Sequence, residues 1–419
     1  MTVDIASATP RPGRFLELEG LRGIASIMVV LAHFIFLFFP AMRKGEMSLA
    51  HHDLEKMVHG TPISMLWDGT LAVAIFFVMS GFVLSIGFFQ TGNTNIVKKL
   101  ATGRYLRLML PALASAIIAW VLIQAGADKL TSAAGEVAGS SNLAKKWQFD
   151  PSLFDVIKAG TLDVFVEYKG SGSAINNVLW TMNVEFLGSF LVFGFLLLFA
   201  QSRLRWLAYV ALLIGTFDTW YLGFIIGMMI ADAHSLGWLE RFKRWYVTLP
   251  LIVLTLFFAS FPRKHKGTLY EVFDLGFIGA NERVMYLTLA STLALLVVLL
   301  SASVAKVLRT KFMSTLGRYT FSLYLTHLLV IFTVSSAVVI FAHDKIGYNA
   351  AALVSFLVSL PVFIIVAFFF ERYIDAPSIK FARFMGAVYR GERTVEGPEG
   401  SPQSNGFREG VRSFFTRKK

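Results

Sequence analysis

The stretch EGLRGIASIMVVLAHFIF, residues 19–36, is an apolar run with one arginine near its start and one histidine inside it. Apolar runs of about 20 residues match the hydrocarbon thickness of a bilayer. Arg22 and His33 stand eleven positions apart, which in a helix leaves an angular offset of about 20° and a rise of about 16 Å. Both side chains therefore project from one face of a predicted helix, with Arg22 at the inner surface and His33 near mid-membrane.

The composition of the whole chain is that of a polytopic membrane protein. Of its 419 residues, 55% are hydrophobic and only 16% are charged, which is too apolar for an ordinary soluble domain. The chain has no cysteine, so disulfides, thiolate metal ligands and a cysteine nucleophile are excluded. Ten apolar runs predict helices, at residues 21–40, 66–89, 106–126, 178–200, 203–217, 219–232, 245–262, 284–303, 318–342 and 349–371.

The distribution of basic residues predicts the orientation. With both termini cytoplasmic, the inner segments hold 26 of the 39 Lys and Arg residues, as the positive-inside rule requires. This bias explains the net charge of +12 without a nucleic-acid partner. We therefore predict an all-α membrane protein of about ten transmembrane helices. A disordered tail at residues 1–14 precedes the membrane domain at 15–377, and a cytoplasmic disordered tail follows at 378–419.

Two predicted outer loops, residues 41–65 and 127–177, are long enough to cap a site. The first carries His51, His52 and His59. These histidines suit a metal, but no carboxylate at ligand spacing supports one, so we interpret them as solvated loop residues and expect no metal.

An ionisable residue inside one of the other spans indicates a buried partner or a function, because placing it at membrane depth costs at least about 2.5 kcal/mol of free energy. Glu185 is expected to orient an imidazole, accept a proton or bind a sugar, or else to pair with a buried cation. His327 is predicted at mid-membrane, with Tyr324 one turn earlier. That pair is either a packing hydrogen bond or part of a site.

Two further segments have both a structural and a functional interpretation. Ser80, next to Gly81 in the second span, fits close helix packing, or else supports a bound substrate. Arg104 and Arg107 lie one turn apart on the predicted inner surface. They are either topogenic charges or a site for a polyphosphate ligand.

Taken together, these segments resemble the acyltransferase-3 superfamily, whose members are integral-membrane enzymes that acylate glycans and other extracytoplasmic acceptors. The resemblance runs from Leu18 to Pro377. It rests on six segments in the expected order: LEGLRGIASIMVVLAH, FFVMSGFVLS, RYLRLMLP, LWTMNVEF, LGRYTFSLYLTHLLV and RYIDAP. Glu19 stands where the family usually has Asp, and Asp375 where it usually has Glu.

The resemblance implies a ten-helix bundle that takes acyl-CoA, most often acetyl-CoA, as donor. Arg22 and His33 would be the essential pair, with Arg104 and Arg107 beside the donor. The expected function is transfer of a short acyl group from cytoplasmic acyl-CoA to a hydroxyl of an extracytoplasmic glycan or glycolipid. The expected location is a bacterial cytoplasmic membrane.

In this scheme His33 is the general base or forms an acyl-histidine, and Glu185 orients it or holds the acceptor. A transporter that uses His33, Glu185 and His327 as a proton relay is the alternative. The sequence shows no inverted repeat to favour a transporter. A third alternative is a catalytically inactive binding scaffold, against which the intact Arg22 and His33 pair argues.

Overall fold

The structure is a computed structural model that describes residues 15–44, 47–167, 170, 174–263, 268–276 and 281–392. Helices dominate this part of the chain, and no strand occurs in it. The predicted all-α class is confirmed. The predicted N-terminal tail, residues 1–14, lies outside the described residues.

Within the described ranges, seven helical segments are long and apolar enough to cross a membrane. They are α1 (Leu16–Phe38), α4 (Gly69–Thr91), α5 (Thr94–Gln124), η4 with α11 (Asn177–Leu179, Trp180–Leu198), α15 (Glu282–Leu300), α17 with η8 and α18 (Lys311–Val330, Ile331–Ser335, Ser336–Ile346), and α19 with η9 and α20 (Tyr348–Phe370, Glu371–Asp375, Ala376–Tyr389). Three shorter helices are α12 (Arg205–Thr216), α13 (Tyr221–Ser235) and α14 (Trp245–Ala259). Each predicted apolar run thus holds a helix, while the number of crossings and the orientation stay predictions.

Short helices connect these segments. They are α2 (Pro40–Lys44), η1 (Met47–Leu49), α3 (Asp53–Val58), η2 (Pro62–Trp67), α6 (Ala127–Val137), α7 (Ser141–Ala144), α8 (Leu153–Lys158), η3 (Ala159–Asp163), α9 (Val164–Val166), η5 (Glu240–Phe242), η6 (Leu269–Phe273) and α16 (Ala302–Leu308). The segment after α5 packs onto the bundle through Trp147, which is 1% exposed. Its indole N–H donates to the Ile175 carbonyl at 2.7 Å.

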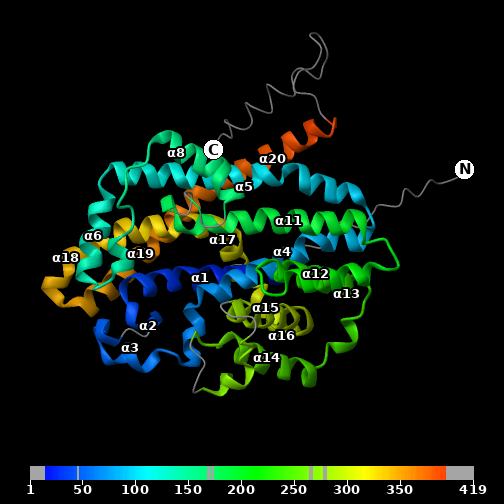
Figure 1. Cartoon of the computed structure of the whole chain (residues 1–419), viewed down its shortest axis with the longest axis horizontal. Helices are drawn as coiled ribbons and strands as arrows, with labels where there is room; N and C mark the ends of the chain where they lie inside the picture. Colours follow the sequence, from blue (N-terminus) through cyan, green and yellow to red (C-terminus); the bar gives the residue numbers. More distant parts are fainter. Residues whose placement is uncertain are drawn as a thin grey trace, which may run out of the picture.

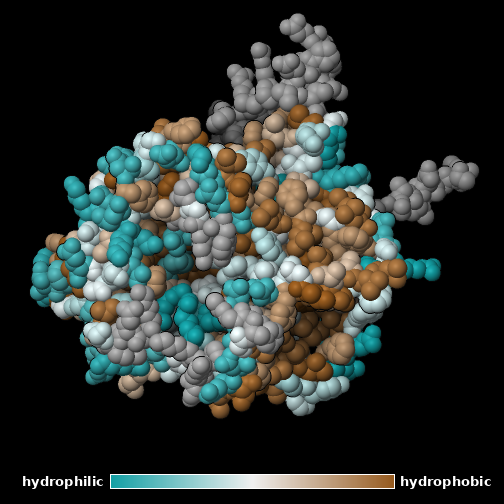
Figure 2. Space-filling model, viewed as in Figure 1, coloured by the Kyte–Doolittle hydropathy of each residue, from teal (hydrophilic) through white to brown (hydrophobic). Residues whose placement is uncertain are grey.

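The long helices run side by side, with α2, α3, α6 and α18 gathered at one end of the bundle (Figure 1). Hydrophilic residues cover that end and surround a recess, whereas a broad hydrophobic face extends over α11 and α12 (Figure 2). On that face Leu198 is 73% exposed and Ile214 is 75% exposed. Large apolar side chains exposed in this density are expected where helices contact lipid.

Glycines set the contact between α1 and α17. A Cβ atom at Gly23 would collide with the Leu316 side chain, and one at Gly317 would collide with the Glu19 carbonyl. Small residues let helix backbones approach closely in a membrane, where packing replaces the hydrophobic effect. This close approach holds the N-terminal parts of α1 and α17 together.

A second close contact joins α4 to α13. A Cβ atom at Gly81 would collide with the Phe224 carbonyl, and one at Gly227 with the Val78 carbonyl. The packing interpretation of the small residues in the second span therefore holds for Gly81. Its neighbour Ser80 faces another helix and has a different partner.

Two predicted boundaries were wrong. Helix α5 begins at Thr94 instead of residue 106, because the Asn93 side chain caps its first turn at 2.9 Å from the Asn95 N–H. Lysine and arginine favour helices but lower hydropathy, so the apolar pattern starts later than the helix. Similarly, the first residues of the predicted tail at 378–419 belong to α20, which packs along α5. The part of that tail from residue 393 onward lies outside the described residues.

The α1–α17 contact gives a testable prediction. Gly317→Ala places a methyl group against the Glu19 carbonyl and forces the two helices apart, so we expect a lower unfolding temperature in detergent. Gly194→Ala is the matched control, since a Cβ atom there meets nothing within 4 Å. A Gly317→Ala protein that unfolds at the temperature of the Gly194→Ala control would contradict the contact.

Candidate functional site

Two histidines from distant parts of the chain meet inside the bundle. His33 lies on α1 and His327 on α17, and the Nδ1 atom of His33 is 3.2 Å from the Nε2 atom of His327. The rings are tilted, with centroids 4.9 Å apart. His327 is fully buried, whereas His33 is partly exposed to a cavity. The sequence placed both at mid-membrane but did not pair them.

Backbone carbonyls fix the tautomers of both rings. The Nδ1 atom of His33 is 2.9 Å from the Val29 carbonyl oxygen, and that of His327 is 3.0 Å from the Leu323 carbonyl oxygen. A carbonyl only accepts, so each neutral ring carries its proton on Nδ1. The Nε2 atom of His327 then accepts from the Nδ1–H of His33. The Nε2 atom of His33 keeps a lone pair, as a general base requires.

His33 lines a cavity of about 730 Å³, here called the outer cavity. Its walls come from the C-terminal half of α1, the start of α4 and the segments that precede α11 and α15. The side chains of Trp180 and Trp220, with ring centroids 5.5 Å apart, form part of the wall. A wide cavity with aromatic walls and a few polar groups is typical of a site for an organic ligand.

A second cavity of about 280 Å³, the inner cavity, lies nearer the N-terminal ends of α1 and α17. Val73 and Tyr324 line both cavities, so the two adjoin. The Tyr324 hydroxyl bonds to the Thr181 hydroxyl at 2.9 Å and donates to the Val178 carbonyl at 3.1 Å. Of the two alternatives for Tyr324 and His327, the packing hydrogen bond is not present: their ring centroids are 6.2 Å apart, and His327 pairs with His33.

Three arginine–carboxylate pairs stand around the inner cavity. They are Arg104 with Glu185, Arg107 with Asp375, and Arg318 with Glu371. Arg104 and Arg107 line this cavity, on a helix that begins at Thr94, about three turns before the predicted run at 106–126. Each guanidinium still has N–H groups beyond those its carboxylate occupies.

Glu185 is committed to this inner network. Besides the Arg104 pair, it accepts a hydrogen bond from the Ser80 hydroxyl at 3.0 Å, and Arg104 also donates to the Ser189 hydroxyl at 2.8 Å. Glu185 lines the inner cavity and His33 the outer one. The predicted pairing of Glu185 with a buried cation is thus observed. The prediction that it orients His33 was wrong, since that place is taken by His327.

Arg22 also lines the inner cavity. Across the part of the chain that the structure describes, no hydrogen bond or ion pair engages its guanidinium, although Glu185 and Asp375 act on its charge from a distance. Arg22 is therefore the cation of this cavity with all its N–H groups available to a ligand.

Sequence reasoning missed several charged residues. Glu371 and Asp232 sit inside or at the end of apolar runs, and that position alone would have signalled buried partners: Arg318 for Glu371, and Arg205 with Tyr209 for Asp232. The outer cavity also contains Arg43, from the short helix α2, and Lys146, from the turn after α7. Nothing in their sequence spacing points to a site.

The loop histidines have structural partners. The His51 ring stacks on Tyr348 at 3.8 Å between centroids, the His52 ring caps α3, and the His59 ring contacts the Met42 carbonyl at 3.0 Å. Within the described residues, no group of three His, Asp or Glu side chains is placed to hold a metal ion.

The Arg104–Glu185 pair predicts an asymmetry between single and double variants. Arg104→Ala leaves a carboxylate without its partner, which typically costs about 3–5 kcal/mol of folding free energy when the pair is buried. The Arg104→Gln/Glu185→Gln double variant removes both charges and should recover much of that loss. The measurement is the unfolding temperature of each purified protein. Equal destabilisation in the single and double variants would show that the pairing is not what stabilises this region.

Comparison with known proteins places this architecture in a family. Residues 15–372 match the acyltransferase-3 family model, described as an acyltransferase domain. No significant match was found among the curated proteins or among the solved structures. The match covers most of the chain, including α1, α5, α11 and α17, which supply His33, His327, Glu185 and the arginines of the inner ion pairs. The chain therefore belongs to the acyltransferase-3 family and is a membrane acyltransferase.

Proposed function

We propose that the protein moves a short acyl group, most often acetyl, from cytoplasmic acyl-CoA to a hydroxyl of an extracytoplasmic glycan or glycolipid. The position of His33 carries this proposal. Its ring lines the outer cavity, which adjoins the inner one at Val73 and Tyr324. A donor entering from one end and an acceptor from the other would meet at this ring.

The inner cavity suits the donor. Its volume of about 280 Å³ fits a slender arm better than a whole nucleotide, so the nucleotide part of coenzyme A would remain at the basic inner surface while the pantetheine arm enters. Arg22 supplies a fully available guanidinium for a phosphate or for the developing charge. Arg104 and Arg107 support the walls through their ion pairs and have further N–H groups to offer.

The chemistry follows from the tautomers. The Nε2 atom of His33 takes the proton of the acceptor hydroxyl while the hydroxyl oxygen attacks the thioester carbonyl. The carbon–sulfur bond then breaks, and the leaving thiolate takes that proton from the imidazolium. In a second route, Nε2 itself attacks the thioester first and later passes the acyl group to the acceptor. Both routes need a free lone pair at Nε2.

His327 is a positioning residue in this scheme. Its Nε2 atom accepts from the Nδ1–H of His33 and so holds the tautomer that leaves the other nitrogen free. When His33 takes up a proton, His327 also stabilises the positive ring by accepting its Nδ1–H, as a hydrogen-bond acceptor at the second nitrogen of a catalytic imidazole does.

The first test of the proposal is acyl transfer from radiolabelled acetyl-CoA to an acceptor extract. For His33→Ala we expect turnover to fall by about 10²–10⁴-fold, the usual contribution of a general base. Near-normal turnover in a folded His33→Ala protein would end the assignment.

His327 needs a graded comparison. His327→Gln keeps an acceptor that can reach the Nδ1–H of His33, whereas His327→Leu does not. We expect turnover to fall further in His327→Leu, with a changed pH profile and an unchanged KM for acetyl-CoA. Equal losses in both variants with an unaltered pH profile would indicate a purely structural role.

Arg22 is tested through donor binding. Loss of a charge-assisted hydrogen bond is worth about 1.5–3 kcal/mol, so Arg22→Gln should raise the KM for acetyl-CoA by about tenfold or more. Arg203→Gln is the control, because Arg203 is an exposed arginine at the same end of the bundle. An unchanged KM in Arg22→Gln would remove Arg22 from the donor site.

A further inference from the structure

The outer cavity has a strongly one-sided charge. Its described lining includes four basic side chains, from Arg43, Lys146, Arg263 and Arg283, and no Asp or Glu. This differs from the inner cavity, where three carboxylates face the arginines. A cavity lined by cations and by no carboxylate favours anions, because its walls focus a positive potential.

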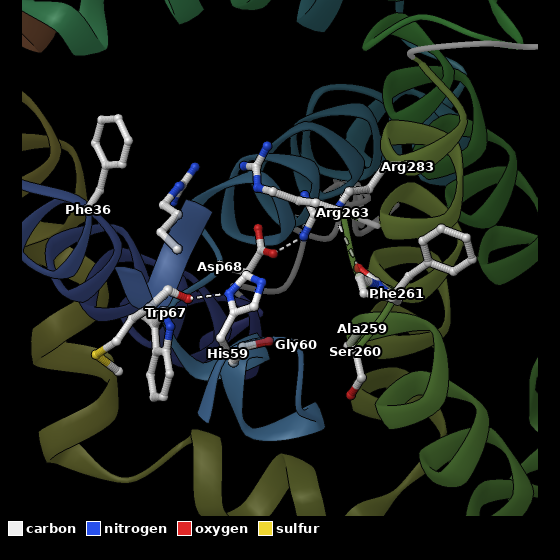
Figure 3. Close-up of a pocket in the computed structure, with 14 residues that line it drawn as sticks. Phe36, His59, Gly60, Trp67, Asp68, Ala259, Ser260, Phe261, Arg263 and Arg283 are labelled. Carbon is white, nitrogen blue, oxygen red and sulfur yellow. Dashed lines mark hydrogen bonds and ion pairs between the residues drawn. The ribbon is translucent and has the colours of Figure 1, made fainter. Parts of the chain in front are cut away.

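A second hollow, here called the Asp68 pocket, adjoins the outer cavity and shares Phe36, Arg43, Arg263 and Arg283 with it. Asp68 caps the first turn of α4 and forms an ion pair with Arg283, whose Nε–H also donates to the Phe261 carbonyl at 3.2 Å. Arg263 and Arg283 lie close together beside Asp68 (Figure 3). Asp68 therefore compensates one of these guanidinium groups and orients it.

The charge of Asp68 acts on the other two arginines, Arg43 and Arg263, only from a distance. In the described part of the chain, neither Arg43 nor Arg263 has a hydrogen bond or ion pair, and the Arg43 guanidinium lies over the Phe36 ring, 5.1 Å from its centroid. Burial, followed by the nearby charge of Arg263, lowers the pKa of Arg43 to about 10. Arg43 thus stays charged at neutral pH despite a repulsive, partly dry environment. A bound anion would relieve that repulsion.

The other walls suit a sugar. The Trp180 and Trp220 rings provide flat apolar faces, and the side chains of Asn142, Asn177 and Asn281 provide amide groups around the same cavity. Asn177 already accepts from the Lys146 ammonium at 3.4 Å. Aromatic faces with a few placed polar groups bind and orient a ligand of this kind.

We infer that the acceptor is an anionic glycan, one that carries a phosphate or carboxylate close to the hydroxyl that is acylated. This inference rests on the proposed function and narrows its substrate class. Arg43 and Arg263 would bind the anion, with the Asp68–Arg283 pair holding the third guanidinium in place. Arg43 and Lys146 also act on the charge of His33, so an anion bound among them offsets their repulsion of a protonated ring.

The test measures binding without a donor, in nanodiscs of zwitterionic lipid. The probes are methyl glucoside, methyl glucuronide, methyl glucoside 6-phosphate and a short prenyl phosphate, which separate a neutral sugar, a carboxylate, a sugar phosphate and a lipid phosphate. We expect at least one anionic glycoside to bind about tenfold more tightly than methyl glucoside, as a charge-assisted hydrogen bond allows. Equal binding of all four probes, or of none, overturns the inference, as does a preference for prenyl phosphate alone.

Variants of Arg43 and Arg263 test whether the preference for anionic glycosides arises at these side chains. Arg263 is exposed at the cavity mouth, so Arg263→Gln should fold normally and lose most of the anionic preference, while Arg263→Lys retains part of it. Arg43→Gln should lose it as well. Lys129→Gln is the control, since Lys129 is an exposed cation of α6 outside the lining of both hollows. A preference that survives both Arg→Gln variants overturns the site.

The two proposals fail separately. If the anionic glycosides bind through Arg43 and Arg263 but no acetyl-CoA is consumed with any acceptor, the proposed function fails and the anion site stands. If acetyl transfer proceeds to neutral and anionic acceptors with equal kcat/KM, the function stands and the anion site is wrong.

Discussion

The contact between His33 and His327 is the constraint on which the site depends. Burying two imidazoles in an apolar bundle costs free energy unless each ring nitrogen has a hydrogen-bond partner or a chemical role. Carbonyls of their own helices occupy two of the four nitrogens, and the contact between the rings occupies a third. The nitrogen left without a partner among the described residues is Nε2 of His33, whose ring lines the outer cavity. Under the proposed function, this leaves one lone pair for the reaction.

That contact requires the glycines of α1 and α17. Gly23 and Gly317 remove the side chains that would hold the two backbones apart, and the rings can then span the remaining gap. Further along the bundle, ion pairs allow helices that carry charged side chains to pack together. The Arg104–Glu185 and Arg107–Asp375 pairs join α5 to α11 and η9, so a helix rich in arginine can lie inside the protein.

The sequence allowed some of this to be predicted. Periodicity placed Arg22 and His33 on one face, and the cost of burying charge singled out Glu185 and His327. The partners could not be predicted, because they are far apart in the chain: 294 positions separate the histidines and 81 separate Arg104 from Glu185. Hydropathy also starts α5 too late, since it scores the buried Arg104 as a surface residue. The cations of the outer cavity come from short connecting segments and from the start of α15, whose relative positions follow only from the folded bundle.

The charge difference between the two cavities bears on how an acyltransferase of this kind can work without carrying its substrates across. The inner cavity has nearly balanced charges and one available guanidinium, whereas the described lining of the outer cavity has four cations and no carboxylate. Under the proposed function, a charged donor and a charged acceptor each bind on their own side, and neither has to pass the junction at Val73 and Tyr324. Only the small, neutral acyl group goes from one cavity to the other. A transporter would have to open and close each side in turn, but this reaction needs only that two bound molecules reach the same imidazole.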